Sequence, residues 1–253
     1  PIRITRRHAV QCLAAAAVPF IVPSRLLGQV APSKKIHLAM IGTGRQAYHT
    51  NLPTLLGMPE VRVVAVCDVD RHRAEAAKAM IDKHYGNADC KLFTDFREAI
   101  EMPDLDAVMN STPDHWHAYM AVYAARKGKH IYGQKPLALN IAEGRLMADE
   151  VAKAGVTWQN GSQQRSDIYF RMACEMVRNE RIGKLKRVRV GLPGGHSNWN
   201  GMADKTEVAP VPADFDYEMW LGPAEQMDYR PALLPLNWRH NFNFSEIGRA
   251  SCR

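Results

Sequence analysis

Lys135 is the residue of this sequence whose surroundings best suit proton chemistry. It lies in Tyr132–Leu137, directly after an apolar run that is typical of a buried strand. Partial burial disfavours the charged ammonium, so a lysine at such a position can exchange a proton near neutral pH. The sequence therefore offers Lys135 as an acid or base, although a solvated loop lysine fits the same spacing.

A glycine-rich stretch, Gly42–Ala47, follows the apolar run Ile36–Ile41 and has the spacing G-x-G-x-x-A. Between a strand and a helix, this spacing is typical of a loop that binds a pyrophosphate. Gly42 permits the tight turn, Gly44 lets the backbone approach the phosphates, and the helix that follows supplies unpaired N–H donors. A glycine turn that binds nothing is the alternative. We expect a dinucleotide to contact the other loop residues too, at Thr43, Arg45 and Gln46.

Asp68 is the acidic partner that such a loop requires. It closes the second apolar run, Val61–Cys67, 24 residues after Gly44. A carboxylate at this point hydrogen-bonds the adenosine ribose hydroxyls and repels a 2′-phosphate. NAD is therefore the expected cofactor, and Arg71 nearby keeps NADP open as an alternative.

A third polar stretch, Asn110–His117, follows another short apolar run. Ligands of a doubly wound sheet bind outside the carboxyl ends of its strands, so this loop should border the cofactor. Asp114 is placed to cap the helix that follows. We expect cofactor contacts from Ser111, Thr112 and Pro113.

The spacing of histidines and cysteines does not favour a metal. His115 and His117 stand two residues apart without a third ligand at a matching distance, and the cysteines of the body are scattered. No metal site is predicted. Buried free thiols are the expected state of Cys67, Cys90 and Cys174.

The elements that must position these residues alternate between strands and helices. Repeated β-α-β units with apolar strands predict an α/β fold with a doubly wound parallel sheet. We expect strands at Ile36–Ile41, Val61–Cys67, Lys91–Phe93, Ala107–Met109, His130–Tyr132 and Val156–Gln159. Helices are expected from Gly44 to Leu56, at Asp70–Tyr85, from a cap at Thr94 to Ile100, and at His115–Lys127 and Ile141–Ala154.

The pattern changes after about residue 160. Ile168–Asn179 is predicted to be helical, and Leu185–Leu192 alternates basic and apolar residues like a strand with one wet face. Proline and glycine then become frequent. We interpret 36–160 as a dinucleotide-binding domain and 161–245 as the incomplete opening of a second domain.

Charge is concentrated at the ends of the chain. The net charge is +7, yet residues 1–35 hold six basic and no acidic side chains, and 36–245 hold 25 of each sign. The neutral charge of residues 36–245 argues against nucleic-acid binding, which requires clustered positive charge.

The start of the chain resembles a twin-arginine export leader, because Arg6-Arg7 precede an apolar run. We therefore expect a periplasmic protein whose leader, residues 1–35, is cleaved or serves as an anchor, with no other membrane span. An amphipathic or disordered tail is the alternative. Residues 246–253 have no apolar period and are expected to be a non-native tail.

Taken together, Gly42–Ala47, Asp68, Thr112–His117 and Gln134-Lys135-Pro136 resemble the Gfo/Idh/MocA oxidoreductase family. The resemblance implies a Rossmann domain followed by an α+β substrate domain on an open sheet, through which members form homo-oligomers. It also implies NAD(P)-dependent oxidation or reduction of a secondary alcohol on a sugar, inositol or related polyol.

The resemblance assigns roles to particular residues. Lys135 assists proton transfer at the reacting hydroxyl, and His117 stands beside it as a second catalytic residue at the cofactor loop. Gln134 occupies the position where the family has Glu, which implies altered tuning of Lys135. Gln163 and Arg165 match the segment that reaches toward nicotinamide and substrate. We therefore add Gln134, Lys135, His117 and Gln163 to the expected cofactor contacts, and Lys135 and Arg165 to the substrate contacts.

Two features bear on the substrate. His196 and Trp199 offer a polar contact and a stacking surface for a sugar ring, with Trp220 and Trp238 as further candidates that also suit a domain core. The family's Gly-x-His-x-x-Asp element is missing, which implies a truncated second domain. A glycosidase that uses bound NAD transiently and a non-catalytic sugar- or cofactor-binding protein remain alternatives.

Overall fold

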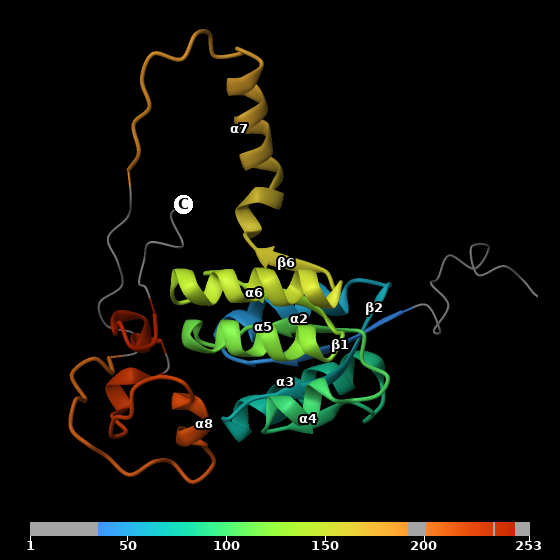
Figure 1. Ribbon diagram of the computed structural model, residues 1–253, viewed down its shortest axis with the longest axis vertical. Coiled ribbons are helices and arrows are strands. Elements are labelled where there is room, and N and C mark those ends of the chain that lie inside the picture. Colours follow the sequence, from blue (N-terminus) through green and yellow to red (C-terminus); the bar gives the residue numbers. More distant parts are fainter. Residues whose placement is uncertain (1–34, 192–200, 235, 246–253) are drawn as a thin grey trace, which may run out of the picture. The chain divides into compact units, whose positions relative to one another are not determined.

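A single parallel sheet organises the protein in its computed structural model, which describes residues 35–191, 201–234 and 236–245. The sheet order is β3-β2-β1-β4-β5-β6, and every neighbouring pair is parallel; Figure 1 labels β1, β2 and β6 of this sheet. The expected leader, residues 1–35, lies outside the described residues except for Lys35. The strands are β1 (Ile36–Ile41), β2 (Val61–Cys67), β3 (Lys91–Phe93), β4 (Ala107–Asn110), β5 (His130–Gln134) and β6 (Trp158–Gly161).

The strand order places a crevice beside β1. The chain runs outward from β1 to β3, then returns to β4 on the other side of β1. The loops after β1 and β4 therefore leave the sheet side by side and diverge, which is where doubly wound sheets bind ligands. The buried strand residues are mostly β-branched or small, as parallel strands covered on both faces require.

Helices cover both faces of the sheet. The apolar side chains of η3 (Ala47–Asn51), α2 (Leu52–Leu56) and α3 (Arg71–Tyr85) pack in one buried cluster with β1 and β2. Those of α4 (Phe96–Ile100), η4 (Asp114–Trp116) and α5 (His117–Arg126) pack in a second cluster, and α6 (Ile141–Ala154) packs on α5. The α/β fold class expected from the sequence is confirmed.

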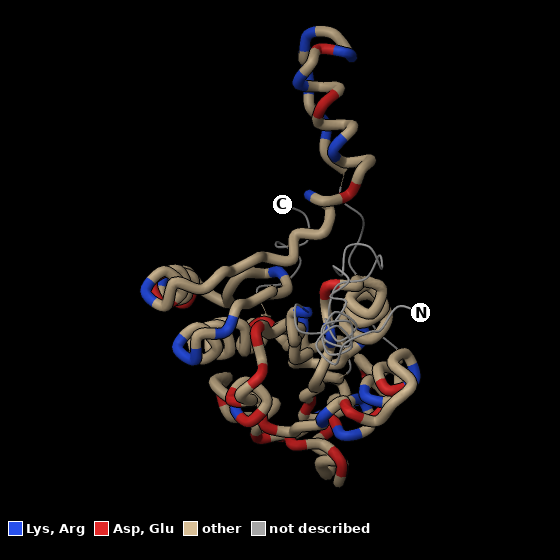
Figure 2. The backbone as a smooth tube through the Cα atoms, turned by 90° about the vertical axis from the view of Figure 1, so that its right-hand side faces the viewer, with Lys and Arg blue, Asp and Glu red and all other residues tan. Residues whose placement is uncertain are grey.

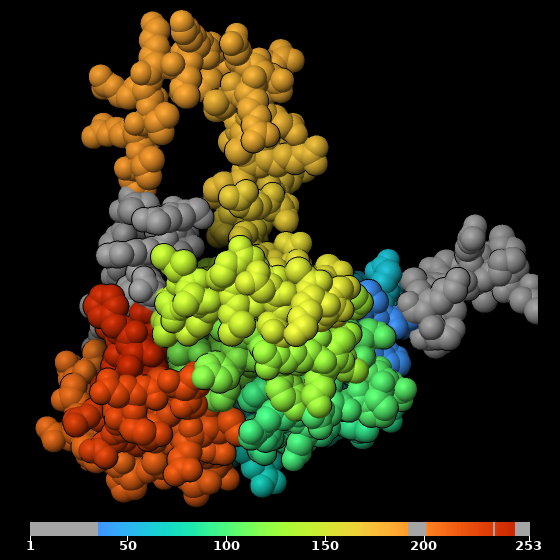
Figure 3. Space-filling view, in the orientation of Figure 1, coloured from blue at the N-terminus to red at the C-terminus, as the bar shows by residue number. Residues whose placement is uncertain are grey.

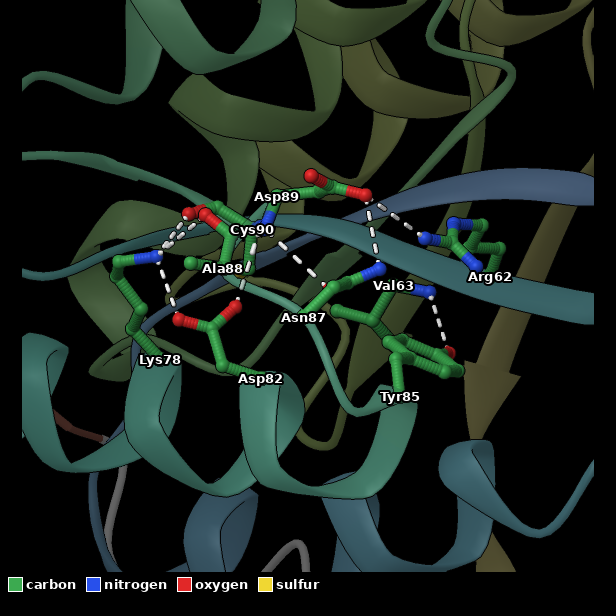
Figure 4. Close-up of polar contacts among 9 residues, drawn as sticks. All are labelled: Arg62, Val63, Lys78, Asp82, Tyr85, Asn87, Ala88, Asp89 and Cys90. Carbon is green, nitrogen blue, oxygen red and sulfur yellow. Dashed lines mark hydrogen bonds and ion pairs between the residues drawn. The ribbon is translucent and has the colours of Figure 1, made fainter.

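The return from α3 to β3 is fixed by polar contacts (Figure 4). Gly86 ends α3 in the left-handed region, at φ 67°. Lys78 Nζ donates to Asp82 Oδ2 at 2.7 Å and to the Cys90 carbonyl at 2.6 Å, while Asp82 Oδ1 accepts from Cys90 N. These bonds tie the last turns of α3 to the start of β3 and so fix the register of the sheet edge.

Several expected boundaries change. The cap of α4 is Asp95 and not Thr94, because the Asp95 carboxylate accepts a hydrogen bond from the Arg97 amide at 2.8 Å.

The cysteines differ in burial. Cys67 and Cys90 are buried free thiols as expected, whereas Cys174 on α7 (Ile168–Arg178) is exposed. The expectation of a third buried thiol is therefore wrong.

Residues 185–191 do not form the expected strand. Their alternating pattern supplies one apolar face, but a strand also needs a neighbour for its backbone hydrogen bonds. None of the described residues pairs with this stretch, and all seven of its residues are exposed. Residue 192 lies outside the described range.

Residues 201–234 and 236–245 include α8 (Tyr217–Leu221) and two short 3₁₀ turns, η6 (Pro231–Leu233) and η7 (Asn237–His240). The backbone joins them to the start of α3, since Arg71 N donates to Asp214 O and Asp216 N to Val69 O. Aromatic side chains build a further buried cluster, with Phe244 and Trp220 ring centroids 4.8 Å apart. Figure 3 shows this segment against the helices that flank the sheet.

Charged residues of both signs are interspersed along the helices, α7 included (Figure 2). Among the described residues, the helices are too short or too polar to cross a bilayer.

Candidate cofactor site

The glycine-rich loop is shaped by close contact with the β4 loop. Gly42 has φ +82°, and a Cβ at this position would lie 2.7 Å from the Ser111 carbonyl carbon. At Gly44 a Cβ would meet only the Arg73 guanidinium, at 3.7 Å. Gly42 thus closes the gap between two loops, and Gly44 leaves backbone open for a phosphate, which is the arrangement a dinucleotide needs.

Asp68 holds the loop from the neighbouring strand. Its Oδ2 accepts from Thr43 N at 2.6 Å and from Thr43 Oγ1 at 2.9 Å, and its Oδ1 accepts from Asp70 N at 2.9 Å. Burial raises the pKa of Asp68, and the two amide hydrogen bonds and the Arg73 charge oppose that rise. The carboxylate is therefore oriented by this chain before any ribose reaches it.

The two arginines of α3 behave differently from expectation. Arg71 pairs with Glu75 at 2.8 Å and is absent from the described pocket lining, whereas Arg73 lines the pocket and pairs with Asp70 at 3.0 Å. Positions two apart on a helix differ by about 200°, so the two side chains point to opposite sides. Of these two arginines, Arg73 is therefore the one that faces the pocket.

His117 joins two loops of the site. It is 1% exposed, its Nδ1 lies 2.6 Å from the Pro136 carbonyl, and its Nε2 lies 3.0 Å from the Thr112 carbonyl. Both ring nitrogens thus lie within hydrogen-bond distance of backbone carbonyl oxygens, which only accept. The placement gives His117 a positioning role between the β4 and β5 loops, and its expected catalytic role stays a prediction.

Lys135 directly follows β5 and is exposed, so the partial burial expected for it from the sequence is wrong, although its neighbours on both sides are fixed. Pro136 is joined to Lys135 through a cis peptide bond, and its carbonyl oxygen contacts His117 Nδ1. On the other side, the buried Gln134 is hydrogen-bonded to the side-chain amides of Asn51 and Gln163. Lys135 makes no hydrogen bond with the described residues and is not part of the pocket lining.

A row of side-chain amides supports Gln134. Gln163 Nε2 donates to Gln134 Oε1 at 3.0 Å, Gln134 Nε2 donates to Asn51 Oδ1 at 3.3 Å, and Asn51 Nδ2 donates to Ser111 Oγ at 3.0 Å. The row crosses the carboxyl ends of β6, β5 and β4. Gln134 and Gln163, predicted as cofactor contacts, are thus brought together as neighbours, and Asn51 is a link that no sequence motif marks.

Asp114 does not cap a helix through its side chain. The residue before η4 is Pro113, and the Asp114 carboxylate accepts from Ser245 Oγ. Burial raises the pKa of Asp114, while the His117 charge is the largest opposing influence, followed by the Ser245 hydrogen bond and the charges of Arg239 and Lys135. Asp114 is therefore a buried acid within an otherwise basic surrounding.

One pocket collects most of the predicted cofactor residues. Thr43 lines an adjoining pocket with Gly44 and Arg45. Arg165 is exposed in η5 (Gln163–Ser166), and His196 and Trp199 lie outside the described residues. The predicted residues in the main pocket are Gly42, Gly44, Arg45, Gln46, Asp68, Ser111, Thr112 and Pro113.

The same pocket includes residues that sequence reasoning did not assign to the cofactor. Trp220, Leu236, Trp238 and Arg239 line it from the segment beyond residue 201, more than 100 residues after the β4 loop residues Ser111–Pro113. Trp220 and Trp238 are each 5% exposed, so they also belong to a core. Only the abundance of aromatic residues in this segment could have signalled its packing.

The composition of the pocket fits a dinucleotide. It combines a glycine loop, an oriented carboxylate and apolar side chains such as Phe96 and Trp116. Within the described residues, no group of three or more His, Cys, Asp or Glu side chains is placed to hold a metal ion.

Comparisons with known proteins indicate the same fold and the same class of cofactor. The family described as "Oxidoreductase family, NAD-binding Rossmann fold" matches residues 36–162. The myo-inositol 2-dehydrogenase of Thermotoga maritima is 31% identical over 157 residues, which are 61% of this chain and 44% of that protein. A glycosyl hydrolase family 109 protein of a Shewanella species is 27% identical over 168 residues. These residues cover 63% of this chain and 36% of the Shewanella protein.

Solved structures show the same architecture. The crystal structure of myo-inositol 2-dehydrogenase from Lactobacillus plantarum superposes with a TM-score of 0.54 at 29% identity, covering 60% of this chain and 43% of that one. The chain thus spans less than half the length of these relatives. On the matched residues and the sheet that they form, the chain belongs to the Gfo/Idh/MocA oxidoreductase family, with its NAD-binding Rossmann fold.

Proposed function

We propose that the protein is an NAD-dependent dehydrogenase that acts on a secondary alcohol of a cyclic polyol, of the inositol or sugar class. The observation that carries the proposal is the pocket formed by Gly42, Gly44, Asp68 and the β4 loop at the carboxyl ends of three neighbouring strands. The inositol dehydrogenases among the relatives support the substrate class.

In this proposal each group of the chain has a defined task. The amides of the glycine loop bind the pyrophosphate, and Asp68 accepts from the adenosine ribose hydroxyls. Bound nicotinamide supplies the hydride acceptor. Lys135 hydrogen-bonds the substrate oxygen and holds the proton that the hydroxyl gives up, while His117 and Gln134 keep the two loops around it in place.

Asp68 also supports a preference for NAD over NADP. Its carboxylate carries negative charge where a 2′-phosphate would lie. Arg73 does not neutralise the negative charge of Asp68, because its guanidinium already pairs with the Asp70 carboxylate.

The experiment incubates the purified protein with NAD⁺ and a panel of inositols and hexoses, and follows NADH by its near-ultraviolet absorbance. NADH formation with one class of polyol is the expected result. NADH binding without turnover of any panel member would favour the non-catalytic cofactor-binding alternative.

A second candidate is a glycosidase that uses bound NAD transiently, which the glycosyl hydrolase family 109 relative favours. Its signature is cleavage of an aryl glycoside without net formation of NADH. The two activities separate in one assay that measures both the released phenol and NADH.

The remaining proposals concern the setting of the enzyme. The paired Arg6 and Arg7 support export to the periplasm by the twin-arginine route, which transports proteins already folded around their cofactors. Replacing both arginines with lysine should retain the protein in the cytoplasm of a host with that route. Homo-oligomerisation is the corresponding proposal for assembly, and light scattering of the purified protein tests it.

A further inference from the structure

The row of side-chain amides ends on a hydroxyl group of the cofactor pocket. Ser111 lines that pocket, and its Oγ accepts a hydrogen bond from Asn51 Nδ2 at 3.0 Å. We propose that Asn51 is a positioning residue of the site: it passes the hydrogen-bond direction set at Gln134 on to Ser111, so that the Ser111 hydroxyl presents its hydrogen to the pocket. The inference rests on the proposed NAD-binding role of the pocket and not on the identity of the substrate.

The direction of the row follows from the chemistry of amides. The oxygen of a side-chain amide only accepts hydrogen bonds, and its nitrogen only donates them. Gln163 Nε2 donates to Gln134 Oε1 at 3.0 Å, and Gln134 Nε2 donates to Asn51 Oδ1 at 3.3 Å. Each inner amide thus accepts on one side and donates on the other. All the bonds therefore run from Gln163 toward Ser111, and the row does not use the hydrogen of the Ser111 hydroxyl.

Burial keeps the inner part of the row bonded. Asn51 and Gln134 are each 6% exposed, so water cannot replace a lost partner for either amide. A buried amide without its hydrogen bonds is costly, which favours arrangements in which every member of the row is paired. Asn51 is also the last residue of η3, and its backbone is therefore fixed by that helix. A change at Gln134 is consequently answered by a turn of the Asn51 amide and not by a gap in the row.

Ser111 is the hydroxyl residue of the β4 loop whose hydrogen is directed by this row. Its backbone is fixed, because Ser111 N donates to Ile41 O at 2.7 Å. The neighbouring hydroxyl of Thr112 donates to Asn110 Oδ1 at 2.7 Å and is engaged within the loop. The phosphates and riboses of a dinucleotide carry oxygen acceptors, and a donor at Ser111 complements them.

The residue at position 134 decides the direction in this arrangement. An ionised carboxylate there only accepts, so in Gln134→Glu it takes hydrogen bonds from Gln163 and from the turned amide of Asn51. Asn51 Oδ1 then faces Ser111 and accepts the hydrogen of its hydroxyl. The row stays fully bonded, but the hydrogen of Ser111 is withdrawn from the pocket. Protonation of the introduced carboxyl restores a donor at position 134 and with it the original direction.

The test is a double-mutant cycle followed as a function of pH. NADH is titrated against the wild type, Gln134→Glu, Ser111→Ala and the double variant from about pH 6 to about pH 9, and each affinity is divided by that of the wild type at the same pH. We expect Gln134→Glu to weaken NADH binding roughly 3- to 10-fold at the alkaline end, as loss of one hydrogen bond does, and to approach the wild type at the acid end. Ser111→Ala should show the loss at every pH. Adding Gln134→Glu to Ser111→Ala should cause no further loss, because the hydrogen is already absent.

Asn51 itself is tested by Asn51→Asp. The ionised carboxylate accepts from Gln134 Nε2 and from the Ser111 hydroxyl, so this variant should show the same loss, and again none beyond that of Ser111→Ala. Gln159→Glu is the matched control, because it introduces the same carboxylate at an exposed amide of β6 and should leave the affinity ratio unchanged.

The outcomes separate the failures. Thermal unfolding identifies the variants that are folded. Equal losses from Gln134→Glu with and without the Ser111 hydroxyl would overturn the proposal, and so would wild-type affinity of folded Gln134→Glu and Asn51→Asp at every pH. Failure of the wild type itself to bind NADH would overturn the cofactor role of the pocket as well.

Discussion

Lys135 is flanked by fixed residues and is itself exposed, which suits a group that has to reach a substrate. We predict that Lys135→Met lowers kcat about 10²- to 10⁴-fold, the usual loss on removal of a general acid or base. The affinity for NADH should not change, because the lysine is not part of the pocket lining. Lys153→Met, on the exposed face of α6, is the matched control. Full activity of Lys135→Met would remove the lysine from the mechanism.

Asp68 sets the expected cofactor preference through its charge. Asp68→Asn keeps an oxygen acceptor for the Thr43 amide and hydroxyl but removes the charge that repels a 2′-phosphate. We predict that the ratio of NADP⁺ to NAD⁺ affinity rises at least about tenfold, which corresponds to ~1.4 kcal/mol. Calorimetric titration of both cofactors measures the ratio, with Asp89→Asn at an exposed ion pair as control. An unchanged ratio would show that another group selects the cofactor.

At the scale of elements, the contact between the β1 and β4 loops is the most constrained feature of the site. Gly42→Ala combines a positive φ with a Cβ 2.7 Å from the Ser111 backbone, whereas Gly86→Ala has the positive φ with nothing within 4 Å. We expect Gly86→Ala to cost about 1–2 kcal/mol of unfolding free energy, the cost of left-handed backbone alone. Gly42→Ala should cost more and abolish NADH binding. Urea unfolding and NADH titration measure both effects, and equal losses in the two variants would contradict the close approach.

The accuracy of prediction from sequence also differs between elements. β1, β2, β3 and α6 begin and end where their apolar runs and caps indicate, because buried parallel strands and capped helices carry local signals. The expected strand at 185–191 is absent because pairing depends on a neighbour and not on its own alternation. The role of His117 depends on two carbonyls from separate loops, and no local pattern specifies such a contact.

At the scale of the whole molecule, His115 connects the segment beyond residue 201 to the dinucleotide domain. Its Nε2 lies 2.9 Å from the Trp220 carbonyl, and its ring packs against Phe244. Burial lowers the pKa of His115 from its ordinary 6.5 to about 4. Between about pH 4 and 6.5, the His115 ring is therefore neutral in the folded protein and protonated in the unfolded chain.

This difference makes stability depend on pH. The contribution of His115 to the unfolding free energy should be fully present above pH 6.5. It should be lost as the pH drops toward 4, and the loss amounts to up to roughly 3 kcal/mol. His115→Gln should flatten that part of the profile even if it lowers stability at neutral pH, while the exposed His84→Gln should not. Urea unfolding across this range, with hydrogen exchange of 215–244, is the measurement. Identical pH profiles for wild type and His115→Gln would refute the assignment.

The lining of the cofactor pocket by Trp238 and Arg239 has a consequence for biosynthesis. A ribosome makes the glycine loop, Asp68 and the whole parallel sheet before it reaches the residues that close the pocket. The pocket is therefore complete only after the segment around η7 has been synthesised and has packed against the sheet.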